Sequence, residues 1–388
     1  MSPVRTECPL RVLHVIGGLN RAGAETALVN IARRIDQQKF SFSFVVHSDQ
    51  PNAYDEVIRS LGMDIIVCSN YQRPWRYASE FLSVLRQRGP YDIVHSHVYV
   101  YSGLIMLLSA CVGIPVRIVH SHTDTSRLQA QARLGRRLYL SAMKRLIRSC
   151  ATNGIAVSQA AAMAVFGTDW RSDPRWRVMH SGIDLHPFHE TWHRDKVKAE
   201  FGIPSSAWVV GQIGRFVPLK NQQFSLDILQ HLLATQDTYL LLVGDGPMRP
   251  EVQARAEAMG LGDRVILVGL RTDIPRLLKG CIDVLLLPSL YEGLGLVGLE
   301  AQAAGVPVLA SDAVPNEMRV VEGMVRTMPL QRPARDWAEA VIALRDGQRV
   351  APERALALME QSDFALDAAV RSLEALYTAL GEAHSAHG

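Results

Sequence analysis

Short apolar runs alternate with segments of helical periodicity along the first half of the chain. The first run, at residues 11–16, ends in Gly17-Gly18, and the segment from about Glu25 to Ile35 carries apolar residues at helical spacing. Short continuous apolar runs are typical of strands buried on both faces of a parallel sheet. We therefore predict a doubly wound α/β domain. Its further strands are expected at residues 42–46, 64–67, 93–95, 116–120, 151–157 and 177–179.

The second half of the chain repeats this alternation without repeating the sequence. A new series begins at Trp208. Its later strands are predicted at residues 239–243, 265–268, 284–287 and 307–310. The polar run from His180 to Pro204 predicts a linker. The expected fold class is α/β, with two Rossmann-like doubly wound domains, residues 1–185 and 186–364, facing across a cleft. The last helix, within residues 365–388, is expected to pack back on the first domain.

The composition describes a well-packed protein without a strongly charged partner. At 388 residues the chain is too long for one ordinary core, and its 48% hydrophobic and 20% charged residues suit two packed domains. A net charge of +3 gives no case for nucleic acid as the main partner. The five cysteines are scattered, which argues against a disulfide frame, and the N-terminus lacks a signal-peptide pattern. We expect a cytoplasmic protein.

Two cations follow the first strand of the second half. Arg215 comes directly after Gly214, and Lys220 lies five positions later. A departing diphosphate leaves negative charge that must be neutralised, and the chain has no Asp-x-Asp pair of the kind that often holds magnesium. Arg215 as a planar fork and Lys220 as a point charge would serve without metal, unless the segment is only a solvated loop. Gly244, after the next strand, lies where such sheets meet ligands, although it equally fits a structural turn.

A glycine-rich turn and the helix after it carry two glutamates, Glu292 and Glu300. The turn follows the predicted strand at 284–287 and leads into a short helix near Leu296. Glycines let a ligand approach the backbone, and a helix start attracts anions. A carboxylate would repel a diphosphate, so we expect Glu292 to bind sugar hydroxyls and Glu300 the ribose. The alternative is an acid at a helix start and a surface acid.

Two histidine pairs each follow an apolar strand. His95 and His97 form one pair, and His120 and His122 form the other. A spacing of two places both members of a pair on one face of an extended chain. Zinc ligation is an alternative, although the sequence offers no other close ligand set. We expect His95 and His120 to be satisfied polar residues at strand ends, and His97 and His122 to reach the ligand site.

The segment from Arg133 to Arg148 is basic and partly amphipathic. Its cations, Arg133, Arg136, Arg137, Lys144, Arg145 and Arg148, are interleaved with leucines and other apolar residues. Such a helix is predicted to lie on an anionic membrane surface, or else to form a solvated face.

An ordered set of motifs runs between residues 11 and 317. The motifs are Gly17–Thr26, Asp92–His97, His120–Thr123, Gly182–Asp184, Gly214-Arg215 with Lys220-Asn221, Val243–Pro247 and Pro288–Glu300. This set resembles the retaining family 4 glycosyltransferases of the GT-B fold, and most of all the capsule and exopolysaccharide enzymes. The resemblance implies a nucleotide-sugar donor, by family habit a UDP-sugar, held mainly by the second domain. It also implies a saccharide acceptor held mainly by the first domain, often lipid-linked at the cytoplasmic membrane face, and no metal or other cofactor.

The same resemblance assigns roles to individual residues. Arg215 and Lys220 match the diphosphate ligands, Glu292 the sugar ligand, Glu300 the ribose ligand, and His122 the histidine near the sugar. The expected donor-binding set is Gly17, Gly18, Gly214, Gly244, Gly293, Leu294, Gly295, Leu296, Val297 and Glu300. The expected acceptor-side set is Asn20, Arg21, Glu25 and His97.

Two other functions fit the same pattern. A nucleotide-sugar 2-epimerase shares the double-Rossmann plan, and it would convert a donor without any acceptor. A non-catalytic nucleotide-sugar-binding protein would bind the donor without turnover.

Overall fold

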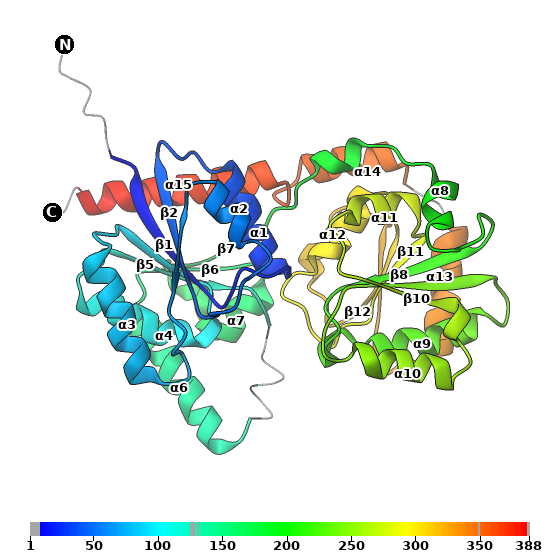
Figure 1. Cartoon of the computed structure of the whole chain (residues 1–388), viewed down its shortest axis with the longest axis horizontal. Helices are drawn as coiled ribbons and strands as arrows, with labels where there is room; N and C mark the ends of the chain where they lie inside the picture. The colour runs from blue at the N-terminus through cyan, green and yellow to red at the C-terminus, as the bar shows by residue number, and fades with distance from the viewer. Residues whose placement is uncertain (1–7, 125–128, 130–131, 348–349, 386–388) are drawn as a thin grey trace, which may run out of the picture. The chain divides into compact units, whose positions relative to one another are not determined.

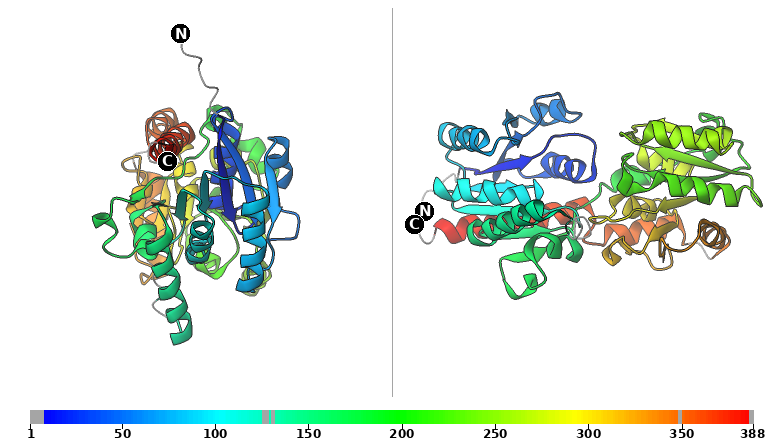
Figure 2. Two further views of the ribbon diagram at one scale, coloured as in Figure 1. Left: turned by 90° about the vertical axis from the view of Figure 1, so that its left-hand side faces the viewer. Right: turned by 90° about the horizontal axis from the view of Figure 1, so that it is seen from below.

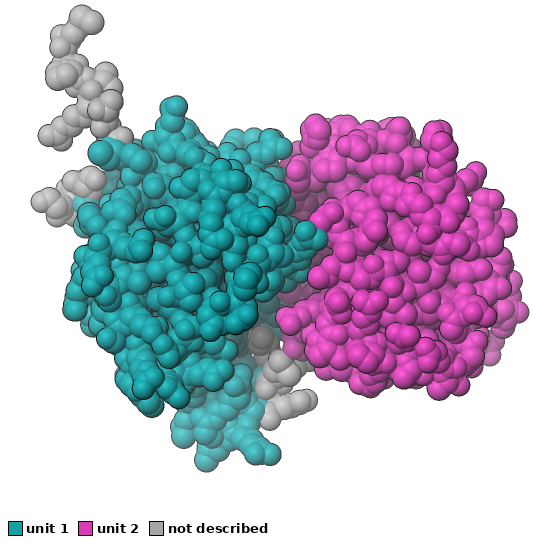
Figure 3. Space-filling model, in the orientation of Figure 1, with its two compact units in different colours: residues 1–182, 366–388 teal, residues 183–365 magenta. Residues whose placement is uncertain are grey.

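The computed structural model describes residues 8–124, 129, 132–347 and 350–385. These residues form two compact units. Unit 1 comprises residues 1–182 and 366–388, and unit 2 comprises residues 183–365 (Figure 3). Each unit is a parallel sheet with helices on both sides (Figures 1 and 2). The predicted fold class is therefore confirmed.

The described strands of unit 1 form a seven-stranded parallel sheet in the order β3-β2-β1-β4-β5-β6-β7. They are β1 (Leu10–Ile16), β2 (Phe40–Val46), β3 (Asp64–Val67), β4 (Ile93–Ser96), β5 (Val116–Ser121), β6 (Asn153–Ala156) and β7 (Trp176–Val178). The order reverses between β1 and β4, and loops leaving the carboxyl ends of two such strands diverge and open a crevice for ligands. The loops at Gly17 and His97 follow these two strands.

The described helices of unit 1 include one from the far end of the chain. They are α1 (Gly23–Arg34), α2 (Asp55–Ser60), α3 (Pro74–Gln87), α4 (Ser102–Cys111), α6 (Leu134–Cys150), α7 (Gln159–Phe166) and α15 (Leu366–Ser385). Leu373 and Tyr377 of α15 are buried in the same apolar cluster as Phe40 and Phe42 of β2. The prediction that the last helix packs on the first domain is confirmed.

The described strands of unit 2 form a six-stranded parallel sheet in the order β10-β9-β8-β11-β12-β13. They are β8 (Trp208–Ile213), β9 (Thr238–Val243), β10 (Val265–Gly269), β11 (Val284–Leu287), β12 (Val308–Ser311) and β13 (Val325–Met328). The helices are α8 (Arg194–Ala199), α9 (Gln222–Leu232), α10 (Arg249–Ala258), α11 (Ile274–Gly280), α12 (Leu296–Ala303), α13 (Ala334–Asp346) and α14 (Pro352–Glu360). Here the order reverses between β8 and β11, which places the ligand edge after these two strands.

The polar run predicted as a linker is largely part of unit 2. Phe188 and Val197 within this run are 1% and 2% exposed. Lys279 Nζ donates hydrogen bonds to the backbone oxygens of Phe188 and Glu190, at 2.6 and 2.7 Å. Buried apolar side chains fix this charged stretch to unit 2. Most of it is therefore part of that domain and does not form an interdomain linker.

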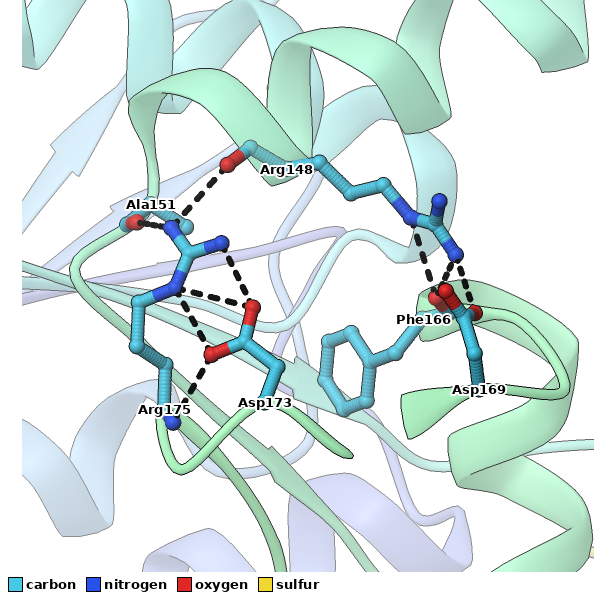
Figure 4. A network of polar contacts seen from close by, with 6 residues as sticks. All are labelled: Arg148, Ala151, Phe166, Asp169, Asp173 and Arg175. Atoms are coloured by element: carbon cyan, nitrogen blue, oxygen red, sulfur yellow. Dashed lines mark hydrogen bonds and ion pairs between the residues drawn. The ribbon is translucent and has the colours of Figure 1, made fainter. Parts of the chain in front are cut away.

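The C-terminal end of α6 is fastened to its neighbours by two arginines (Figure 4). Arg148 Nη2 donates to the backbone oxygen of Phe166 at 2.7 Å and to Asp169 Oδ1 at 2.6 Å. Arg175 Nη1 donates to the backbone oxygen of Arg148 at 3.0 Å, and its Nη2 pairs with Asp173 Oδ2 at 2.7 Å. These contacts join α6 to α7 and to the approach to β7. Arg148 therefore has a structural role and is not a free surface cation.

Candidate functional site

Most of the predicted site residues lie beyond the carboxyl ends of strands that flank the reversal in strand order of each unit or pair with a flanking strand. In unit 2, Gly214 and Arg215 follow β8, while Glu292 and the start of α12 follow β11. Gly244 follows β9, which pairs with β8. In unit 1, the loop at Gly17 follows β1, His97 follows β4 and His122 follows β5. Parallel strands deliver their carboxyl ends to one edge, which explains how motifs far apart in sequence come together within a unit.

Lys220 and Glu292 form an ion pair in unit 2. Lys220 Nζ lies 2.5 Å from Glu292 Oε1 and donates to it, and Ser289 Oγ donates to the same oxygen at 2.7 Å. The Glu292 side chain is only 9% exposed. Ser289 was not among the predicted site residues, although its position just after β11 and Pro288 was a signal. Lys220 was predicted to bind the diphosphate and Glu292 the sugar, whereas in this structure the two side chains pair with each other.

Buried glutamine side chains hold the backbone of the loop that carries Arg215 and Lys220. Gln212 Nε2 donates to the backbone oxygen of Lys220 at 2.6 Å, and Ser225 Oγ donates to Gln212 Oε1 at 2.7 Å. Gln222 Nε2 donates to the backbone oxygen of Arg215 at 3.0 Å. The Arg215 side chain is exposed and has no carboxylate partner in the part of the chain that the structure describes. It is therefore a cation available to an anionic ligand.

Gly244 has a packing role that is independent of any ligand. Its φ angle is +133°, and a Cβ at this position would lie 2.1 Å from the backbone oxygen of Gly214. The loops after β8 and β9 therefore meet backbone to backbone. The neighbouring Asp245 accepts a hydrogen bond from the Gly246 backbone N–H at 2.7 Å and pairs with Arg249 at 3.6 Å. Asp245 thus stabilises its own turn.

The glycine-rich turn after β11 ends in a left-handed residue. Gly295 has a φ angle of +85° and precedes α12, while Leu294 is buried with 3% exposure. This conformation suits glycine and directs the chain into the first turn of α12. Glu300 lies on α12 and is half-buried. Burial raises the pKa of its carboxyl to about 7.

The glycine loop after β1 is tied to the segment before α2. Asn20 Nδ2 donates to Asn52 Oδ1 at 2.9 Å, and the Ala53 backbone N–H donates to Asn20 Oδ1 at 3.4 Å. A Cβ on Gly18 would lie 2.8 Å from Asn52 Oδ1, so the loop leaves little space there. Asn20 therefore holds the loop in shape, and Asn52 is a positioning residue that the sequence did not reveal. Of the other predicted acceptor-side residues, Arg21 is exposed and Glu25 lies in the first turn of α1.

His97 and His122 are brought together at the strand ends of unit 1. His97 Nδ1 lies 2.8 Å from His122 Nε2, and His97 Nε2 lies 3.0 Å from His14 Nδ1. A second chain of contacts runs through His95, whose Nε2 is 3.2 Å from His120 Nδ1 and whose Nδ1 is 2.6 Å from the Tyr377 hydroxyl. The prediction of satisfied hydrogen bonding is confirmed for His95 and wrong for His120, whose buried Nε2 has no partner among the described residues.

Burial keeps these imidazoles neutral. It lowers the pKa of His14 to about 3 and that of His122 to about 4. The pKa values of His95, His97 and His120 are lowered well below the usual range, by burial first and by the neighbouring histidines second. His14 was not among the site residues predicted from the sequence. Its position as a polar residue inside the apolar run of β1 was the available signal.

Two family models match the chain, one in each half. The model described as "Glycosyltransferase Family 4" matches residues 21–186, and the model described as "Glycosyl transferases group 1" matches residues 193–354. The first match falls mostly in unit 1, and the second lies within unit 2.

The chain is also similar to individual proteins. It is 34% identical over 335 residues to EpsF of Bacillus subtilis (strain 168), whose name assigns it provisionally to the glycosyltransferases; the match covers 85% of this chain and 86% of that protein. It is 27% identical to the UDP-Gal:alpha-D-GlcNAc-diphosphoundecaprenol alpha-1,3-galactosyltransferase of Escherichia coli, over 59% of each chain. Among solved structures, HepE of Anabaena in complex with UDP-glucose superposes with a TM-score of 0.79 at 21% identity, over 95% of this chain and 100% of that one.

Proposed function

Because the chain belongs to the family 4 glycosyltransferases of the GT-B fold, we propose that it moves a sugar from a UDP-sugar to a hydroxyl of a saccharide acceptor, with retention of anomeric configuration and without a metal. The acceptor class we propose is a lipid-linked saccharide of surface polysaccharide synthesis. The UDP donor is supported by the names of two similar proteins, which mention UDP-galactose and UDP-glucose.

The observation that carries the proposal is the pairing of Lys220 with Glu292 beside the loop that holds Arg215. A donor has an anionic diphosphate and a neutral sugar, and it needs cations for the one and hydroxyl acceptors for the other. Arg215 has no competing carboxylate in the described residues. Lys220 and Ser289 both donate to Oε1 of Glu292, which leaves Oε2 to accept from a sugar hydroxyl. A nucleotide-sugar diphosphate fits this arrangement of charges.

The chemical step we propose is a front-face substitution. The bond between the anomeric carbon and the diphosphate oxygen breaks, and a bond to the acceptor oxygen forms on the same face. A phosphate oxygen of the leaving group takes the acceptor's hydroxyl proton. The chain's own contribution is to stabilise the leaving diphosphate through Arg215, Lys220 and the amides at the start of α12. Such a step needs no protein carboxylate as nucleophile.

The test uses purified full-length protein, labelled UDP-sugars, synthetic polyprenyl-diphosphate saccharides and excess EDTA. We expect label in the acceptor at an undiminished rate, and an unchanged anomeric configuration in the product by NMR. Complete loss of transfer in EDTA would overturn metal independence, and an inverted product would overturn retention. Formation of an isomeric UDP-sugar without acceptor would indicate an epimerase. Donor binding without turnover across the acceptor panel would indicate a binding protein.

Donor binding is expected to depend on pH through Glu300. Burial raises the pKa of this carboxyl to about 7, so it is mostly protonated below that pH and charged above it. If it accepts hydrogen bonds from the ribose hydroxyls, UDP affinity should rise several-fold between pH 6 and pH 8, since a charged acceptor binds more strongly. Isothermal titration of UDP across this range measures the effect. Glu300→Gln should remove the pH dependence, and a variant that kept it would contradict the assignment.

The stability of the chain should change with pH in the opposite direction. The folded-state pKa of Glu300 lies above its ordinary value of 4.5, so the folded state binds this proton more tightly than the unfolded state does. The resulting contribution is fully present below about pH 4.5 and is lost as pH rises through about 7. Donor binding and folding therefore favour opposite protonation states of Glu300.

Membrane attachment through α6 is proposed for its N-terminal half. This half projects from its unit (Figures 1 and 2), with Leu134 and Leu138 exposed by 72% and 64% beside Arg136 and Arg137. The C-terminal half serves other contacts, since Arg148 binds Asp169 and Lys144 donates to Gln129 Oε1 at 2.6 Å. Exposed leucines between arginines suit an anionic lipid surface. No helix in the described ranges is long and apolar enough to cross a bilayer.

The double variant Leu134→Asp/Leu138→Asp should bind anionic vesicles at least tenfold less tightly, because it removes apolar contacts and adds repulsive charge. Co-sedimentation with phosphatidylglycerol vesicles measures this, and neutral vesicles serve as the lipid control. The matched protein control is Leu270→Asp, since Leu270 is 56% exposed on unit 2. Equal retention of both variants on vesicles would rule out docking through α6.

A further inference from the structure

Five histidines from three neighbouring strand ends of unit 1 form one cluster. His14 lies in β1, His95 in β4 and His120 in β5, and His97 and His122 follow β4 and β5 directly. The ring centroids of His120 and His122 are 4.0 Å apart, and those of His95 and His97 are 4.4 Å apart. No carboxylate belongs to either ligand set that the described residues offer here. Of the five, the family resemblance assigns His122 to the donor sugar and His97 to the acceptor side.

The cluster contains two sets of three potential ligands. One ring nitrogen from each of His97, His120 and His122 lies within 4.8 Å of the other two, and the same holds for His14, His95 and His97. Two nitrogens bound to one ion at about 2.0–2.1 Å lie roughly 2.8–3.4 Å apart in tetrahedral or octahedral geometry. Three hydrogen-bonded nitrogen pairs have such spacings: His97–His122 at 2.8 Å within the first set, His14–His97 at 3.0 Å within the second, and His95–His120 at 3.2 Å between the two sets. Small rotations of the rings would therefore allow two hydrogen-bonded nitrogens to bind the same metal ion.

Each ligand set also contains a ring nitrogen without a partner. Among the described residues, His14 Nε2 and His120 Nε2 are buried and make no hydrogen bond. A buried polar atom left unsatisfied costs about 1–3 kcal/mol, and such atoms often indicate an ion or water that completes the site.

We propose that His97, His120 and His122 form a binding site for a divalent transition metal ion of the zinc class, and that the bound ion inhibits the enzyme. This set is preferred over the other because His97 and His122 are half-buried, whereas His14 and His95 are fully buried. An ion can therefore enter from solvent. Three imidazoles and a water form a common coordination shell for zinc, and imidazole disfavours magnesium and calcium.

Inhibition follows from the double use of His122. This residue is the one assigned near the sugar, and a metal-bound imidazole cannot also contact a substrate hydroxyl through the same nitrogen. The inhibitory part rests on the proposed transferase function, whereas the binding part does not. A zinc ion here is thus compatible with a reaction that needs no metal.

The binding experiment uses full-length protein without a polyhistidine tag, stripped with EDTA and titrated with Zn²⁺ and Co²⁺. We expect one equivalent of each ion per chain and visible cobalt bands of tetrahedral type. His120→Asn should weaken binding by more than 100-fold, since loss of an outer-shell partner alone costs 10–100-fold. His193→Asn, at an exposed histidine of unit 2, is the matched control and should bind like the wild type. Thermal unfolding of each variant without metal verifies that it is folded.

The activity experiment measures sugar transfer with increasing Zn²⁺. Wild type and His193→Asn should lose activity at one equivalent and regain it with EDTA, while His120→Asn should need at least 100-fold more zinc for the same fractional loss. Equal binding by His120→Asn and wild type, or loss of binding in His193→Asn, would overturn the site. Stoichiometric binding without inhibition would overturn the inhibitory role alone. A preparation that binds zinc but transfers no sugar would count against the transferase proposal and leave the metal site standing.

Discussion

Replacing Lys220 by alanine is expected to lower kcat by about 10²–10³-fold, the usual effect of removing one group that stabilises a developing oxyanion. The KM for the donor should change much less, because the negative charge on the diphosphate grows as the bond breaks. The structure adds a second consequence. The variant leaves the buried carboxylate of Glu292 without its cation, which should lower the free energy of unfolding by about 1–3 kcal/mol. Steady-state kinetics and thermal unfolding measure the two effects.

A second substitution separates these two effects. Lys220→Ala combined with Glu292→Gln removes the uncompensated charge, and Ser289 can still donate to the amide oxygen. This double variant should regain most of the lost stability without regaining activity. Lys196→Ala, at an exposed lysine of unit 2, is the matched control and should behave like the wild type in both assays. A Lys220→Ala enzyme with a wild-type turnover rate would contradict the role of this lysine.

Gly244→Ala is expected to destabilise unit 2 by more than about 3 kcal/mol. An alanine at a φ angle of +133° is strained, and its Cβ would lie 2.1 Å from the backbone oxygen of Gly214. The loop after β8 would have to move, and Arg215 and Lys220 with it, so transfer should fall even where the protein still folds. Thermal unfolding followed by circular dichroism, together with the transfer assay, measures both losses.

Two further glycines separate the causes of this destabilisation. Gly260 has a φ angle of +69°, but a Cβ added there would have no atom within 4 Å, so Gly260→Ala carries backbone strain without a clash and should cost about 1–2 kcal/mol. Gly262 has neither strain nor a neighbour, and Gly262→Ala should be nearly neutral. If Gly244→Ala were no worse than Gly260→Ala, the close approach of the two loops would not matter for stability.

The sequence predicted the strands well where a short apolar run is bounded by turn residues, at the edge of a sheet as well as in its centre. The predicted strands at 64–67 and 284–287 coincide with β3 and β11, because turn residues bound each apolar run on both sides. No predicted strand corresponds to β13, an edge strand with half-exposed side chains at Val325, Thr327 and Met328. Two of its four residues, Arg326 and Thr327, are polar, so its hydrophobic pattern is weak.

The candidate site was predicted as a set of positions and not as a set of contacts. Motif spacing indicated Arg215, Lys220 and Glu292, but the ion pair between Lys220 and Glu292 joins residues 72 positions apart. Such a contact depends on the strand order, which places β8 next to β11. The contact between Tyr377 and His95 could not be predicted for the same reason, since the two residues are 282 positions apart in the sequence. Local pattern can indicate which residues matter, whereas topology decides what they touch.

The place of α15 in unit 1 has a consequence for synthesis of the chain. Residues 1–182 are synthesised before unit 2, but their apolar cluster around Phe40 and Phe42 lacks Leu373 and Tyr377 until all of unit 2 has been made. Unit 2 is one continuous stretch, residues 183–365, and has all its parts earlier. Although domains generally fold in the order of their synthesis, here the unit that is made first is completed last. A chain truncated before residue 366 would contain all of unit 2 but would lack the helix that covers the apolar cluster of unit 1.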